Sequence, residues 1–296
     1  MYTITEVGGM PGGEAFLLVT EDKTALIDSG FSFHAPQMVR RIKQILGGRP
    51  LDYVLLTHSH YDHASGSAYL RDEWSDIVIT GSAHARQILE KPSARSFIRE
   101  MNNNAALCCG IKEYPDKTDS LHIDRIVSEG SVIDLGSITL RVIETPGHTK
   151  CSVSFYSKEA GLLIASETLG IPVAGRVMPC YMVGYQMTMD SIRRSAALAP
   201  QKILIPHIGI IGDETCAHFF ESSLYWHEEM MRRIVGGHID GKTTEQLSQE
   251  FTDLFYVDNV VRIQPEKAFL LNLSYTVPML INEMAKQKTG APSEIL

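Results

Sequence analysis

The short apolar run of residues 53–56 is followed by four potential metal ligands within six positions. Side chains alternate along an extended chain, so His58 and His60 project to the same side, and Asp62 and His63 follow as the chain turns. One histidine at a strand end is usually a satisfied structural group, but packing does not explain four such side chains together. Because imidazole and carboxylate suit zinc, iron and manganese, the cluster predicts a metal site held by one strand-end loop. One loop of this kind can serve two metals.

The first two thirds of the chain alternate between strand-like and helix-like patterns. Two-residue alternation and short apolar runs predict strands, and apolar residues three or four positions apart predict helices. The β-rich part is expected to end with the last of these strands. The predicted strands are residues 2–7, 15–20, 24–28, 53–56, 77–80, 131–134, 139–144, 152–156, 162–165 and 202–206, and the predicted helices are residues 36–46, 82–90, 93–107 and 190–198.

The C-terminal part shows a helical pattern throughout. Its first helix is expected to end at the glycine pair of residues 236–237. Thr243 and Gln246 have the spacing of a capping box that opens a second helix. Pro265 can open a third helix, and Pro278 is expected to kink or interrupt it, because proline removes one internal hydrogen bond.

The composition is that of a globular protein of 296 residues, with 44% hydrophobic and 21% charged residues. A net charge of −8 gives no global attraction to phosphate backbones, so nucleic acid is not an expected partner. The five cysteines form no CxxC pair, which predicts a reducing, cytoplasmic location. The N-terminus lacks the features of a signal peptide. The longest uncharged stretch, residues 268–282, is shorter than the ~20 residues that span a bilayer, so no membrane association is expected.

These motifs resemble the metallo-β-lactamase superfamily. Its HxHxDH signature is matched by residues 58–63. The next histidine of the family lies in a Gly-His-Thr turn after a strand, as His148 does here, and its last histidine follows a late strand, as His207 does. The matches cover roughly residues 12–210 in the order of the family's motifs and strands. The resemblance implies an αββα sandwich.

One position departs from the family pattern. The family has an aspartate that bridges both metals, and Glu167 takes its place here. A glutamate is one methylene longer and can bridge the metals, bind one of them or stand apart, which leaves the metal count open. Earlier in the chain, Asp28 and Gly30 match another family pattern, and we interpret Asp28 as holding a loop beneath the site and Gly30 as permitting a tight turn.

The resemblance implies a domain of residues 1–213 with the αββα fold and C-terminal helices, residues 214–296, that pack on it as a substrate cap. Two divalent metal ions are implied, with zinc as the first choice and iron or manganese as alternatives. Asp62 and Glu167 are the implied catalytic residues. The first metal would be held by His58, His60 and His148, and the second by Asp62, His63 and His207, with Glu167 and a water between them.

Such a site implies hydrolysis, because two divalent ions generate hydroxide at neutral pH and polarise a carbonyl or phosphoryl oxygen. The C-terminal helices resemble those of the glyoxalase II-like and thioesterase-like branch, which implies a small activated acyl substrate: a thioester, ester or lactone. A small-molecule phosphodiesterase and a non-catalytic, metal-bound regulatory protein are the alternatives. A further alternative is an oxygen-handling iron enzyme of the flavodiiron type. Such enzymes carry a carboxylate at the place of His60 and an added flavin domain, so the histidine at this position argues against that alternative. A homodimer is left open.

Weaker signals are given structural interpretations or secondary roles. Residues 177–187 are rich in methionine and tyrosine, and packing competes there with a pocket in which Tyr181 or Tyr185 hydrogen-bonds the substrate. The adjacent Cys108 and Cys109 are expected to serve packing, because neighbouring cysteines rarely meet disulfide geometry. Five further histidines lack ligand-rich neighbours and are expected to be structural or solvated: His84, His122, His218, His227 and His238.

Overall fold

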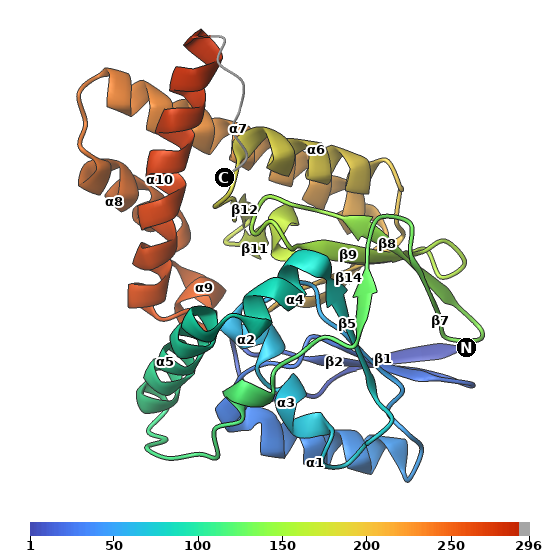
Figure 1. The fold of residues 1–296 in the computed structure, drawn as a ribbon. Coiled ribbons are helices and arrows are strands. Elements are labelled where there is room, and N and C mark those ends of the chain that lie inside the picture. Colours follow the sequence, from blue (N-terminus) through green and yellow to red (C-terminus); the bar gives the residue numbers. More distant parts are fainter. Residues whose placement is uncertain (290–296) are drawn as a thin grey trace. The chain divides into compact units, whose positions relative to one another are not determined.

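The computed structural model describes residues 1–289 (Figure 1). Contacts within the chain divide it into two compact units. The N-terminal unit comprises Met1–Glu144 and Cys151–Ser166, and the C-terminal unit comprises Thr145–Lys150 and the chain from Glu167 onward. Within residues 1–289, no helix combines the length and the apolar content that a membrane span requires.

The first sheet of the N-terminal unit has six strands in chain order, antiparallel at first and then parallel. Two hairpins begin it, and the parallel strands that follow are joined by helical crossovers, which parallel pairing requires. The strands are β1 (Tyr2–Glu6), β2 (Phe16–Thr20), β3 (Thr24–Ile27), β4 (Tyr53–Leu55), β5 (Val78–Ser82) and β6 (Arg125–Val127). All except β6, a short strand with two exposed residues, were predicted from the sequence.

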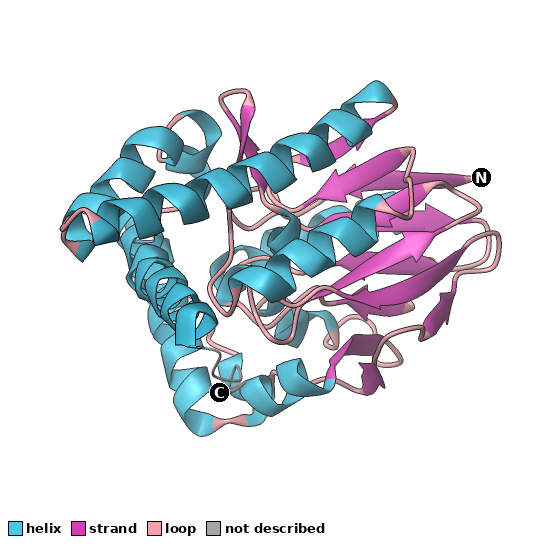
Figure 2. Cartoon of the chain, turned by 90° about the horizontal axis from the view of Figure 1, so that it is seen from above, coloured by secondary structure: helices cyan, strands magenta, loops and turns pink. Residues whose placement is uncertain are grey.

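The second set of strands in this unit is antiparallel throughout. A hydrogen bond joins the two sets, because Thr20 Oγ1 donates to the Leu135 carbonyl at 2.7 Å. Nearly every side chain of β2 and β3, and of β9 and β10, is buried, so these four strands are covered on both faces. Figure 2 distinguishes the strands from the helices. The strands are β7 (Val132–Asp134), β8 (Thr139–Glu144), β9 (Val153–Ser157) and β10 (Leu162–Ile164).

Helix α1 (Ala35–Leu46) shows how the sequence pattern builds the outer layer. Pro36 occupies its first turn, and its buried residues, including Met38 and Ile42, join the core formed by the first sheet. The helix ends where Gly47 takes a left-handed φ of 57°. The remaining helical segments of the unit are η1 (Ser32–His34), α2 (Tyr61–Ala64), α3 (Ser67–Leu70), α4 (Ala83–Glu90), α5 (Pro92–Cys108) and η2 (Thr118–Ser120).

The C-terminal unit contains more β-structure than the sequence predicted. A hairpin of β11 (Ile171–Val173) and β12 (Arg176–Met178) follows η3 (Glu167–Leu169). After helix α6 (Tyr185–Ala196), β13 (Lys202–Ile205) pairs with β14 (Gly209–Gly212). The expectation that the β-rich part ends after residue 206 was therefore wrong. β14 has four residues with glycine at both ends. Because glycine indicates a turn in a sequence, this short strand was not predicted.

The helices from α7 onward confirm the predicted helical extension, because α7 (Glu214–Ile239) starts at residue 214. The division into a domain of residues 1–213 and a cap remains a prediction. Thr243 and Gln246 form the predicted capping box at the start of α8 (Thr244–Phe255). The short helix α9 (Asp258–Ile263) was not predicted, and α10 (Glu266–Thr289) follows Pro265 as expected.

The structure has no helix interruption at two places where the sequence suggested one. Helix α7 continues through Gly236 and Gly237 to Ile239. A Cβ at Gly237 would lie 2.7 Å from Leu247 Cδ2, so the glycine permits the close packing of α8 against α7. Pro278 lies inside α10 without interrupting it, and the kink that was the alternative expectation stays a prediction. Neighbouring side chains of α10 are fully buried, and their packing outweighs the one lost hydrogen bond.

Candidate metal centre

The predicted ligand cluster lies in the loop that leads from β4 into α2. His58 is fully buried and His60 is half-buried, and their ring centroids lie 4.6 Å apart, as expected for side chains on the same side of the chain. His63, in α2, is also buried, and its ring centroid lies 4.1 Å from that of His58. The loop therefore brings three imidazole rings together, with Asp62 half-buried beside them.

A buried carboxylate holds two residues of this loop. Asp28 Oδ2 accepts a hydrogen bond from His63 Nδ1 at 2.8 Å, and Oδ1 accepts one from the backbone N–H of Thr57 at 2.8 Å. Asp28 follows β3 and has a positive φ of 54°, which turns its side chain toward the loop. The interpretation of Asp28 as a residue that holds the loop is confirmed, and its direct contact with a predicted ligand is an addition.

The protonation of both rings follows from these hydrogen bonds. Thr57 Oγ1 donates to the Asp28 carboxylate at 2.9 Å, so it is an acceptor toward His58 Nδ1, 3.0 Å away. His58 and His63 therefore each carry a proton on Nδ1 and present Nε2 as the ligand atom. Hydrogen bonds of this kind fix the orientation of metal-binding histidines and raise their basicity.

The C-terminal unit gathers the other three predicted ligands. Glu167 lies at the start of η3, and its Oε2 is 2.5 Å from His148 Nε2, while its Oε1 is 2.9 Å from His207 Nε2. His207 follows β13 with a positive φ of 62°, a strained conformation that turns it toward the carboxylate. Glu167 therefore reaches both histidines at once, one with each oxygen.

The position of His148 is fixed by its neighbours in the same unit. Its Nδ1 donates to the Cys180 carbonyl at 2.8 Å, which directs Nε2 toward Glu167. Its backbone N–H donates to Thr168 Oγ1 at 3.1 Å. The preceding residue, Gly147, has no room for a side chain, because a Cβ there would lie 2.3 Å from Thr188 Oγ1. Neither Cys180 nor Thr168 was identified from the sequence, because the first acts through its carbonyl and the second is an ordinary hydroxyl.

The neighbouring histidines determine the protonation state of Glu167. Burial alone would raise the pKa of this carboxyl group, but His148 and His207 outweigh burial and hold the pKa well below its usual range. Glu167 is therefore a carboxylate, the form that binds metals.

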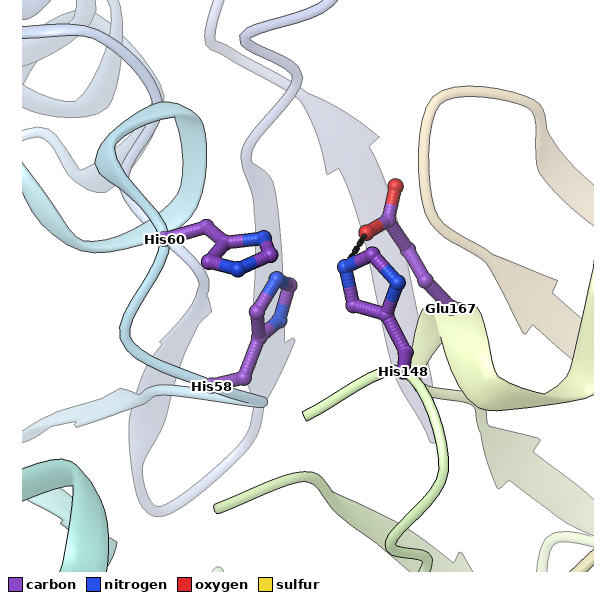
Figure 3. A group of neighbouring side chains, drawn as sticks. All are labelled: His58, His60, His148 and Glu167. Carbon is purple, nitrogen blue, oxygen red and sulfur yellow. Dashed lines mark ion pairs between the residues drawn. The ribbon is translucent and has the colours of Figure 1, made fainter. Parts of the chain in front are cut away.

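The structure contains two groups of potential ligands, which correspond to the two sets that the family resemblance implied; Glu167, expected between the sets, falls in the first group. Within each group the ligand atoms lie within 4.8 Å of one another. Figure 3 draws the side chains of the first group, with the ion pair between His148 and Glu167 as a dashed line. Imidazole nitrogens and carboxylate oxygens are a donor set that suits zinc, iron or manganese, so these residues fit the implied metals. The groups are His58, His60, His148 and Glu167, and Asp62, His63 and His207.

The two tyrosines proposed from the sequence differ in exposure. Tyr181 is fully buried, and its hydroxyl donates to the His227 carbonyl at 3.4 Å. Tyr185 is half-buried, with its ring centroid 6.2 Å from that of Tyr181. These contacts leave the substrate role of both tyrosines as a prediction.

The other histidines and the cysteines lie outside both ligand groups of the described chain. His218 and His238 are exposed, whereas His227 is fully buried. Burial lowers the pKa of His227 to about 4, and its Nδ1 donates to the Ser223 carbonyl. All five cysteines are free, so Cys108 and Cys109 form no disulfide, as expected; both are exposed at the end of α5, which excludes core packing for this pair.

Comparisons with known proteins agree with the order of motifs and strands. The family model of the metallo-β-lactamase superfamily matches residues 9–207. A metallo-β-lactamase fold-containing protein, ST1585, from Sulfurisphaera tokodaii is 24% identical over 228 residues, which cover 75% of this chain and 82% of that protein. A hydroxyacylglutathione hydrolase from Chelativorans sp. is 28% identical over 157 residues, covering 53% of this chain and 47% of that enzyme, so the match spans about half its length.

The fold comparison covers nearly the whole chain. A metallo-β-lactamase family protein, TTHA1429, from Thermus thermophilus has a TM-score of 0.67 at 20% identity, with 97% of this chain and 94% of that chain covered. This similarity confirms the predicted αββα fold with its helical extension. The chain therefore belongs to the metallo-β-lactamase superfamily, whose members are mainly hydrolases.

Proposed function

We propose that this protein is a metal-dependent hydrolase of small activated acyl compounds: thioesters, esters or lactones. The observation that carries the proposal is the position of Glu167, whose two oxygens lie 2.5 Å from His148 Nε2 and 2.9 Å from His207 Nε2. One histidine belongs to each ligand group, so a single carboxylate reaches both groups. This arrangement supports a bridging role for Glu167 and a pair of metal ions, with zinc as the first choice and iron or manganese as alternatives.

When bound, two divalent ions would supply hydroxide at neutral pH and polarise the carbonyl of the substrate. The residues of the chain prepare the site for them. Asp28 and Thr57 hold the protons of His63 and His58 on Nδ1, and the Cys180 carbonyl does the same for His148. Asp62 and Glu167 would supply the negative charge that offsets the charge of the bound metals, and would orient the attacking water.

Acyl substrates are favoured by the names of several relatives. Four of the similar enzymes are hydroxyacylglutathione hydrolases, and that name specifies cleavage of an acyl–glutathione compound. The net charge of −8 works against long polyanions but not against small phosphodiesters. A small-molecule phosphodiesterase is therefore the second candidate, and a regulatory metal-binding protein without turnover is the third.

The remaining parts of the proposal concern the surroundings of the site. The helices of residues 214–289 would act as a substrate cap, with Tyr185 as the more accessible of the two tyrosines for a substrate. Tyr181, which is fully buried, would contribute after a local rearrangement. Five free cysteines support a reducing, cytoplasmic location, and a homodimer remains compatible with the proposal.

The test combines metal analysis with three substrates. Protein purified without added metal is analysed for bound elements and assayed with a thioester, a lactone and a bis-aryl phosphodiester, before and after treatment with a chelator. We expect two metals per chain and acyl hydrolysis that disappears when the metals are removed. His58→Ala and His60→Ala should lose metal and activity, whereas His218→Ala, an exposed control outside the ligand groups, should keep both. Unchanged hydrolysis by verified metal-free protein would contradict the proposal.

A further inference from the structure

The segment between β12 and α6 holds His148 in place. The Cys180 carbonyl accepts the Nδ1 proton of His148 at 2.8 Å. Two backbone N–H groups of the same segment, those of Met182 and Val183, donate to the Gly147 carbonyl at 3.0 Å each. Because Gly147 directly precedes His148, these three hydrogen bonds fix both the backbone and the ring of this ligand. We call residues 180–186 the histidine strap.

Helix α10 holds the histidine strap at two further points. Thr276 Oγ1 donates to the Tyr181 carbonyl at 2.8 Å, and this threonine is buried. Glu283 accepts two backbone hydrogen bonds, from Tyr185 N–H at 2.6 Å and from Gln186 N–H at 3.0 Å. These contacts join positions that are separated by 95 to 98 residues in the sequence.

Glu283 supplies the N-terminal cap that the sequence of α6 lacks. The N-cap residue, Gly184, has no side chain, so the first amides of the helix need another acceptor. The Glu283 carboxylate accepts from two of these amides, and its negative charge lies at the positive end of the helix dipole. The start of α6, and with it the end of the histidine strap, therefore depends on α10.

We propose that Glu283 and Thr276 are positioning residues for His148, acting on this ligand through the histidine strap. The inference rests on the proposed metal centre and extends it to the C-terminal helix. Without the two anchors the strap can move, and the Cys180 carbonyl no longer holds Nδ1 of His148. Metal–ligand distances tolerate only ~0.2 Å, so a small displacement of Nε2 weakens metal binding.

The experiment uses the full-length chain and two readouts that need no turnover. The first is amide hydrogen exchange of Met182 and Val183 in metal-free protein. The second is zinc affinity, measured by competition with a chelating dye, in which the binding step lost in His148→Ala identifies the site of that ligand. In Glu283→Ala we expect faster exchange at these amides than in wild type. The zinc dissociation constant of this site should increase about 10-fold, because loss of a residue that orients a metal ligand costs this much in affinity.

Two further variants remove only part of the contacts between α10 and the histidine strap. Glu283→Gln keeps one carbonyl oxygen, which can accept from one of the two amides, so its effects should lie between those of wild type and Glu283→Ala. Thr276→Val removes the hydroxyl but keeps the shape and should loosen the strap at Tyr181. The matched controls lie on the same helix: Glu266→Ala removes an exposed carboxylate, and Ser274→Ala removes an exposed hydroxyl that donates to Leu271 within α10.

The proposal is overturned if Glu283→Ala and Thr276→Val keep wild-type exchange and zinc affinity. It is also overturned if the two control variants show the same losses, because the effect would then be general destabilisation. Should Glu283→Ala fail to fold, Glu283→Gln and Thr276→Val decide the outcome. Failure of the proposed hydrolysis is separate, since it would appear as absent turnover of all three substrates while the exchange and zinc measurements still give their result.

Discussion

Asp28 Oδ2 accepts the Nδ1 proton of His63 at 2.8 Å, and both side chains are almost completely buried. The same carboxylate accepts hydrogen bonds from the backbone and hydroxyl of Thr57, whose hydroxyl lies 3.0 Å from His58 Nδ1. One carboxylate thus orients a ligand of each group, and it belongs to neither group itself.

We expect Asp28→Asn to weaken zinc binding about 10-fold or more, because removal of a partner that orients a ligand typically costs 10–100-fold in metal affinity. Asparagine tolerates the positive φ of 54° at this position, so the variant tests the carboxylate rather than the backbone. Competition with a chelating dye measures the affinity. Asp134→Asn, which changes an exposed residue of β7, is the control. Equal zinc affinity in Asp28→Asn and wild type would reduce Asp28 to a loop-packing residue.

Removal of the Glu167 side chain tests the proposed bridge. We expect Glu167→Ala to reduce metal content, mostly at the site of Asp62, His63 and His207, and to lower hydrolysis at least ~10-fold. Glu167→Asp should retain more metal than Glu167→Ala, although its shorter reach need not restore full activity. Elemental analysis and initial rates measure both effects. Two metals per chain and normal turnover in Glu167→Ala would show that Glu167 does not bridge.

The buried His227 predicts a loss of stability in acid. Its pKa is about 4 in the folded protein, because burial disfavours the charged ring, against 6.5 for an unperturbed histidine. Between these values the unfolded chain binds a proton that the folded chain does not, so stability falls as the pH drops through this range. At pH 7.5 the His227 ring is largely neutral in both the folded and the unfolded state, so its protonation has little effect on stability.

We expect wild-type protein to lose about 2–3 kcal/mol more unfolding free energy than His227→Gln between pH 7.5 and pH 4.5. Urea unfolding of metal-free protein at the two pH values measures the difference. His218→Gln, which changes an exposed histidine, should behave as wild type. The same acid-induced loss in wild type and His227→Gln would show that another group is responsible.

Deletion of the C-terminal helices tests their structural role. Helix α7 buries Phe219, Phe220 and Met230 and contacts α6 and β12 within its own unit. A chain without residues 216–296 should expose the apolar faces of these elements, so we expect aggregation or loss of substrate binding. Light scattering and activity assays measure the outcome. A soluble, fully active truncated chain would show that the helices form a separate module.

Local features of the sequence were sufficient for much of the fold and for half of the candidate site. His58 and His60 were predicted to lie together because side chains two positions apart in an extended chain project to the same side, and this needs only a few residues of local structure. The apolar period of α1, its glycine stop and the capping box of α8 were read correctly for the same reason. His148, Glu167 and His207 lie far from this loop in the sequence, and only the resemblance to a known family linked them to it.

Tertiary packing decided what local patterns could not. The glycine pair in α7 looks like a helix stop, yet Gly237 is where α8 packs closely, and burial of α10 keeps Pro278 inside a continuous helix. The cap of α6 comes from Glu283, about a hundred residues further along the chain. Periodicity records only which neighbours a residue has along its own helix or strand. The partners that orient His148, and the residues that hold those partners, are set by chain topology, because they meet only after the chain has folded.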